Sequence, residues 1–179
     1  ALGAGLLDPA TFTAVRVGSG AMVLGVLAVL GGARRSAGFD PGMVAGLFAY
    51  MAGFSFAYVT LDTGTGALIL FAVVQLTMFA TALVGGERFA FRGWLGLSLA
   101  LAGLVGQVAP GGSAPEPLGA VLMTVAGIGW ALYTLRGRRA GAPLLTTATN
   151  FAWVLPLTLI LYAAAPGEHV VSSRGLALA

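Results

Sequence analysis

Few side chains in this sequence could do chemistry, and most of them are amides or large aromatic rings within long apolar segments. At such positions they either contact a neighbouring helix or line a cavity for a small molecule. The candidates for lining a solute cavity are Gln75, Tyr50, Tyr58, Trp130, Tyr133 and Asn150. For Gln75 we favour the cavity, because Thr77 and Met78 beside it supply an adaptable wall. For Asn150 both interpretations stay open.

The aromatic candidates stand at helical spacing. Tyr50, Phe54 and Tyr58 recur every four residues and predict a ridge along one helix, with the two hydroxyls available to a solute. The same segment carries a stripe of small residues at Gly42, Gly46 and Gly53, which predicts close approach of another helix. Trp130 and Tyr133 belong either to an aromatic belt at the membrane surface or to the wall of the cavity.

Two charged residues are candidates for a gate or an ion pair. Arg16 lies within an apolar segment, and Asp62 follows the end of the next one. Antiparallel neighbouring helices would bring the two to similar depth, where a guanidinium and a carboxylate form a two-point hydrogen-bonded pair. Such a pair either locks two helices together or forms an outer gate. We expect Arg16 and Asp62 to be in contact in both cases, and the remaining alternative is that they make no contact.

These residues need membrane-spanning elements to position them. Of the 179 residues only 8% are charged, while 58% are hydrophobic and 28 are glycine, which excludes a water-soluble globule and a disordered chain. Apolar runs near the roughly 20 residues needed to cross a bilayer predict an all-α polytopic bundle of six transmembrane helices. We place them at Phe12–Leu30, Pro41–Leu61, Gly66–Gly85, Gly93–Ala109, Leu118–Leu135 and Pro143–Ala165.

Arginines predict the orientation of this bundle. They gather in alternate connectors, at 31–40, 86–92 and 136–142, as Arg34, Arg35, Arg88, Arg92, Arg136, Arg138 and Arg139. By the positive-inside rule these three loops face the cytoplasm, so we expect a multi-pass protein of the cytoplasmic (inner) membrane. The net charge of +3 then needs no nucleic-acid partner, because the basic residues are divided among loops instead of forming one patch.

Two segments resemble each other. The stretch opening at Asp8-Pro9 aligns with the one opening at Ala142-Pro143, and Pro, Thr and Ala match in place. By the arginine pattern the two copies cross the membrane in opposite directions, because an odd number of helices separates their starts. Inverted repeats of this kind are typical of secondary transporters.

Several short motifs in order resemble the EamA family of the drug/metabolite transporter (DMT) superfamily. They are Asp8-Pro9 with Phe12 and Arg16, Gly86-Glu87-Arg88, Trp94-Leu95-Gly96 with Gly103, Gly119, Trp130-Ala131-Leu132-Tyr133 and Arg138-Arg139. The resemblance implies a ten-helix inverted-repeat permease, of which this chain is a fragment covering helices two to seven. Residues 1–109 would form most of the first repeat and residues 118–179 the start of the second. One departure is Val74-Gln75, where the family often has a proline.

We therefore expect a permease or exporter that moves small metabolites or drugs by alternating access. Few charges lie in the membrane, so the expected solute is neutral, zwitterionic or a lipophilic cation, with no cofactor, no metal and no catalytic residue. The lipid bilayer is the surrounding partner, and assembly into homodimers is left open. The alternatives are a non-transporting structural or interaction subunit and, less favoured, an intramembrane enzyme. Ser19 between glycines resembles a protease serine, but His169 lies near the far end of the chain.

Overall fold

The computed structural model describes residues 6–32, 38–108, 115–165, 172 and 175–176. Within these residues every regular element of four or more residues is an α-helix. The six helices are α1 (Pro9–Leu30), α2 (Pro41–Ala57), α3 (Thr63–Val84), α4 (Phe91–Val108), α5 (Pro117–Gly137) and α6 (Pro143–Ala164).

The helix starts follow from local chemistry. At α1, α2 and α5 an acidic residue comes directly before a proline, and its carboxylate accepts backbone N–H bonds of the first turn. Proline at the first helical position loses nothing, since its missing N–H has no partner in the helix. Asp40 accepts from the amides of Gly42 and Met43, at 2.8 and 3.1 Å. At the far ends Gly32 and Gly86 adopt positive φ, at 79° and 86°, where the chain turns out of α1 and α3.

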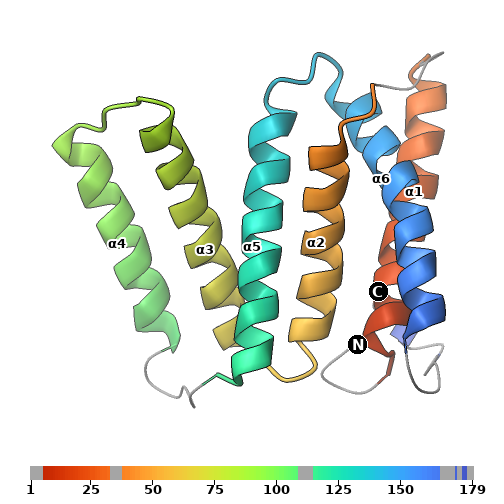
Figure 1. Cartoon of the computed structure of the whole chain (residues 1–179), viewed down its shortest axis with the longest axis horizontal. Helices are drawn as coiled ribbons and strands as arrows, with labels where there is room; N and C mark the ends of the chain where they lie inside the picture. The colour runs from red at the N-terminus through yellow and green to blue at the C-terminus, as the bar shows by residue number, and fades with distance from the viewer. Residues whose placement is uncertain (1–5, 33–37, 109–114, 166–171, 173–174, 177–179) are drawn as a thin grey trace.

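The helices form a row instead of following chain order. Figure 1 shows α4, α3, α5 and α2 side by side from left to right, with α6 and α1 crossing at the right. In this row α4 and α3 are antiparallel, as are α5 and α2, whereas the neighbours α3 and α5 run in the same direction. The most extensive packing joins helices far apart in sequence, α2 with α5 and α1 with α6. This order separates α3 from α1, because α5 and α2 lie between them.

Three connectors meet at the upper end of the row, those between α1 and α2, α3 and α4, and α5 and α6 (Figure 1). We call this the arginine end, because these connectors and the helix turns beside them carry Arg88, Arg92, Arg136, Arg138 and Arg139. The prediction that alternate connectors share one end holds for these five arginines. Arg34 and Arg35 of the 31–40 loop lie outside the described residues.

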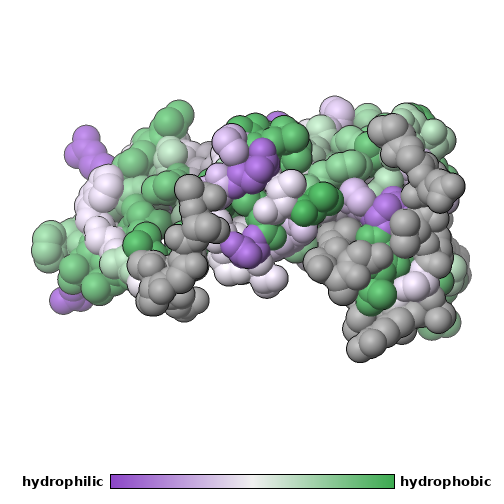
Figure 2. All heavy atoms as spheres, turned by 90° about the horizontal axis from the view of Figure 1, so that it is seen from below, coloured by the Kyte–Doolittle hydropathy of each residue, from purple (hydrophilic) through white to green (hydrophobic). Residues whose placement is uncertain are grey.

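Four helices are long and apolar enough to cross a membrane, namely α1, α3, α5 and α6. The two other helices are shorter apolar segments, α2 with 17 residues and α4 counted over Phe91–Gly106. The predicted span Pro41–Leu61 is too long at its end, since residues beyond Ala57 form turns, with the amide of Val59 donating to the carbonyl of Phe56. Many large hydrophobic residues are exposed on the outer surface, and Figure 2 shows green along its upper edge and at its left end. The molecule is thus a helical bundle with an apolar outer surface of the kind that contacts lipid.

Glycines allow α2 and α5 to pack with their backbones in contact. A Cβ atom added at Gly46 would lie 2.8 Å from the carbonyl oxygen of Gly129, and one at Gly53 would lie 2.8 Å from that of Leu122. Real Cβ atoms do not come this close, so any larger residue would push the helices apart. The helix that was expected to approach the small-residue stripe is therefore α5.

Candidate functional site

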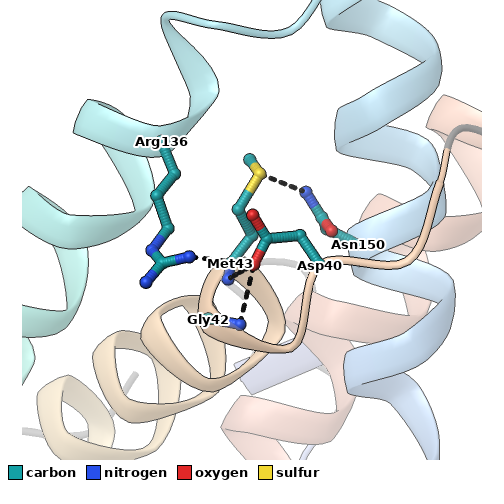
Figure 3. Close-up of polar contacts among 5 residues, drawn as sticks. All are labelled: Asp40, Gly42, Met43, Arg136 and Asn150. Carbon is teal, nitrogen blue, oxygen red and sulfur yellow. Dashed lines mark hydrogen bonds and ion pairs between the residues drawn. The ribbon is translucent and has the colours of Figure 1, made fainter.

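Polar contacts gather where α2 begins at the arginine end (Figure 3). Besides capping α2, Asp40 accepts a hydrogen bond from Nη1 of Arg136 in the last turn of α5, at 3.2 Å. Both side chains are substantially exposed, at 37% for Asp40 and 54% for Arg136. The carboxylate of Asp40 thus caps the start of α2 and also pairs with the end of α5. This pair was not predicted from the sequence, although the acid-proline pattern marks Asp40 as a cap.

Asn150 joins the same region from α6. Its side chain is 1% exposed, and Nδ2 donates to Sδ of Met43 at 3.8 Å, a contact drawn in Figure 3. The donor therefore points to α2 and not into open space. Of the two interpretations left open for Asn150, this geometry favours the interhelical contact.

Four of the predicted cavity residues form one aromatic ladder together with Phe54. We define this ladder as Tyr58, Phe54, Tyr50, Trp130 and Tyr133. Along this order the ring centroids are 4.8, 5.7, 4.7 and 5.9 Å apart. Phe54 and Tyr50 come from α2, Tyr58 directly follows its last residue, and the last two rings come from α5. Trp130 remains 37% exposed, while the tyrosines and Phe54 are part-buried. The ridge predicted on one helix is thus continued by the rings of its neighbour.

Arg16 does not pair with Asp62 in this structure. Its guanidinium carbon lies 5.3 Å from the ring centroid of Phe12 and 5.1 Å from that of Phe54, within the range of cation–π attraction. Asp62 is exposed and precedes α3, while Arg16 belongs to α1 on the other side of α2. The expected contact is wrong because α3 packs on α5 and leaves α2 between the two charges.

Gln75 lines a groove of about 640 Å³ between α3 and the end of α5. Its amide is exposed, and Met78 is part of the same wall, whereas Thr77 is not. The groove opens at the arginine end, and its lining includes one acid and two bases, Glu87, Arg138 and Arg139. A groove with a polar amide, an adaptable thioether and charges of both signs suits a small solute. The binding of a solute beside Gln75 stays a prediction.

The opposite end of the α2–α5 contact carries a second polar link. Glu116 accepts hydrogen bonds from the amides of Gly119 and Leu118, at 2.6 and 3.0 Å, and from the hydroxyl of Thr60 at 3.1 Å. These hydrogen bonds lower the pKa of Glu116 below its usual 4.5. The N–H of Gly119 lowers it most, that of Leu118 comes next, and the Thr60 hydroxyl contributes least. Glu116 was not predicted from the sequence either, although Glu116-Pro117 repeats the acid-proline signal.

The described residues contain no group of three or more His, Cys, Asp or Glu side chains able to hold a metal ion.

The fold and these sites define an all-helical bundle of membrane type, with polar links at both ends of one helix pair and an aromatic ladder between them.

Comparison with known proteins gives a relative of similar sequence. No protein-family model and no solved structure matches the chain. The chain is similar to the uncharacterized protein PA1977 of Pseudomonas aeruginosa, with 46% identity over 176 residues. This match covers 97% of the chain but 61% of the relative, so the chain spans less than two thirds of that protein's length.

Proposed function

We propose that the chain is part of a secondary transporter of the EamA kind, a permease of the cytoplasmic membrane that moves small solutes by alternating access. In this proposal all six helices span the membrane as helices two to seven of ten, with the arginine end in the cytoplasm. The greater length of the relative leaves room for the remaining helices.

The relation between α1 and α6 carries this proposal. Each helix has 22 residues and begins with a proline. In each, a threonine hydroxyl four residues on donates to that proline's carbonyl, Thr13 to Pro9 at 2.7 Å and Thr147 to Pro143 at 2.9 Å. The two helices run in opposite directions and pack on each other. A pair of inverted copies in mutual contact supports an inverted-repeat transporter.

The candidate sites support a role in solute binding. The aromatic ladder offers ring faces, and the groove beside Gln75 offers an amide and both charges. Neutral, zwitterionic and lipophilic cationic solutes all suit such surfaces. In alternating access one repeat rocks against the other, so a solute bound between them would face each side of the membrane in turn.

The topology can be tested cleanly because the chain has no cysteine. Gly141→Cys lies in the α5–α6 connector, where a side chain meets open space, and Thr63→Cys lies at the exposed start of α3. A membrane-impermeant maleimide should label Thr63→Cys in right-side-out vesicles and Gly141→Cys in inside-out vesicles. Labelling of both variants from the same side would contradict the inverted arrangement.

Transport itself requires a flux measurement. We expect proteoliposomes that hold the full-length protein to take up labelled solutes from a panel of amino acids, organic amines and neutral metabolites, at rates above protein-free liposomes. Saturation by the unlabelled solute would distinguish a carrier from a leak. A folded, reconstituted protein that moved no member of the panel would favour a structural subunit instead.

A further inference from the structure

Arg16 presents hydrogen-bond donors that the described residues do not use. It lies two turns into α1, part-buried, with its guanidinium beside Phe12 of its own helix and Phe54 of α2. Its Nη1 atom is buried and has no hydrogen-bond partner among the described residues. Cation–π contacts attract the charge but do not accept the N–H groups, which lie in the guanidinium plane.

The guanidinium of an arginine stays charged in proteins and offers only donors, so it cannot satisfy itself at this position. A buried charged donor without an acceptor is costly, and ionisable groups inside membrane helices mark binding sites and pathways. A hydrogen-bond acceptor beside Arg16 would remove this cost, and the acceptor that best matches a planar guanidinium is a carboxylate.

The acids of the described residues are placed elsewhere. Asp8, Asp40 and Glu116 cap the starts of α1, α2 and α5. Asp62 precedes α3 beyond α2, and Glu87 lines the groove at the arginine end. The acceptor for Arg16 is thus not one of these side chains, and a bound solute can supply it.

The aromatic ladder begins beside this charge. Phe54, one of the two rings next to Arg16, is followed by Tyr50, Trp130 and Tyr133, so ring faces lead away from the guanidinium. We propose that Arg16 binds the carboxylate of a small solute whose apolar body packs along the ladder. The proposal rests on the proposed transport function and narrows its solute class. Of the solutes expected from the sequence it favours zwitterions that carry a carboxylate, and it disfavours lipophilic cations.

Three molecules of nearly the same shape separate charge from apolar contact: phenylacetate, phenylacetamide and 2-phenylethylamine. The measurement is the thermal unfolding midpoint of the full chain in an uncharged detergent with each probe. At concentrations well above its Kd, phenylacetate should raise the midpoint by about 4 °C, with little effect from the amide or the amine. A larger shift with the amine than with phenylacetate would overturn the proposal.

Substitutions then assign the effect to Arg16. Arg16→Gln should abolish the phenylacetate shift, and Arg16→Lys, which keeps the charge but loses the two-point geometry, should weaken binding by about tenfold. Arg92→Gln removes an exposed arginine at the start of α4 and should leave the shift unchanged. An equal shift in Arg16→Gln and in the unaltered protein would show non-specific binding and overturn the assignment. If Arg16→Gln fails to fold, the phenylacetate shift is measured in Arg16→Lys and Phe54→Leu instead. Full phenylacetate binding in both variants would overturn the proposal.

Flux data separate this inference from the transport proposal. Phenylacetate binding that depends on Arg16, without flux of any solute, would keep the carboxylate site and contradict transport. Flux of lipophilic amines that is unchanged in Arg16→Gln would keep transport and contradict the carboxylate site. Anionic lipid is a second source of oxyanions, so the shift is also measured in nanodiscs of phosphatidylcholine alone and with phosphatidylglycerol. A phenylacetate shift in phosphatidylcholine nanodiscs supports the solute site, and stabilisation by phosphatidylglycerol alone overturns it.

Discussion

The two long-range helix pairs differ in what their glycines meet. In the α2–α5 contact the neighbour is backbone, since a Cβ at Gly129 would lie 2.6 Å from the carbonyl oxygen of Gly46. In the α1–α6 contact the neighbour is a side chain, since a Cβ at Gly20 would lie 2.5 Å from a ring carbon of Phe151. A phenyl ring can rotate away, but a backbone carbonyl moves only with its helix. The first contact is therefore rigid and the second is adjustable.

Polar links strengthen this difference. The α2–α5 contact is held at one end by Asp40 and Arg136 and at the other by Thr60 and Glu116. In the α1–α6 pair the hydroxyls of Thr13, Thr147 and Thr158 donate to carbonyls of their own helices. Pro156 also interrupts the hydrogen bonding within α6. We infer that α2 and α5 move as one body and that relative motion is easier between α1 and α6, the inverted copies.

The largest expected effect comes from a methyl group in the rigid contact. Gly129→Ala should destabilise the protein by about 1–3 kcal/mol, because two backbones must separate. Gly20→Ala should cost less, since the Phe151 ring can move. Gly103→Ala is the matched control on α4, where a Cβ meets nothing within 4 Å and alanine favours the helix by up to about 1 kcal/mol. The free energy of unfolding in mixed dodecylmaltoside–SDS micelles measures all three. Equal losses for Gly129→Ala and Gly20→Ala would contradict the comparison.

Separating the two roles of Asp40 gives the next largest effect. Asp40→Ala removes both the cap of α2 and the ion pair and should cost about 1–2 kcal/mol. Asp40→Asn keeps a capping oxygen and loses only the ion pair, so it should cost less than about 1 kcal/mol. Arg136→Ala should match Asp40→Asn, and the same unfolding measurement compares them. A cost for Arg136→Ala as large as that of Asp40→Ala would show that the ion pair, and not the cap, dominates.

Much of the fold was predictable from sequence because it depends on local signals. Apolar length gives the number of helices, and the acid-proline steps at Asp40 and Glu116 place helix starts to within a residue or two. The end of α2 was missed by four residues, because Tyr58 to Thr60 are apolar or uncharged and the chain turns there through backbone hydrogen bonds. Hydropathy does not report such a turn.

The candidate site was less predictable, because it depends on which helices are neighbours. Helical spacing predicts the Tyr50 and Phe54 ridge, but only the packing of α5 on α2 brings Trp130 to it. The Arg16–Asp62 pairing failed for a related reason. The helices α1 and α2 do pack on each other, but α2 ends at Ala57, so Asp62 falls at the start of α3, which packs on α5. Depth in a membrane follows from sequence position, whereas lateral order in the row does not.

The smallest expected effect lies at the opposite end of the rigid contact and depends on pH. The pKa of Glu116 is lowered in the folded protein, so its stabilising contribution is complete above its usual pKa of 4.5. That contribution is lost as the pH falls from 4.5 through the lowered pKa. The reason is that a protonated carboxyl is a weaker acceptor for the backbone N–H groups of the first turn of α5. Thermal unfolding between pH 3 and pH 6 should therefore show a decline that Glu116→Gln reduces. Glu87→Gln removes the same charge at the arginine end, where no helix start depends on it, and should leave the decline in place. If Glu87→Gln flattened the profile as much as Glu116→Gln, general charge repulsion, and not the link between α5 and α2, would account for the acid sensitivity.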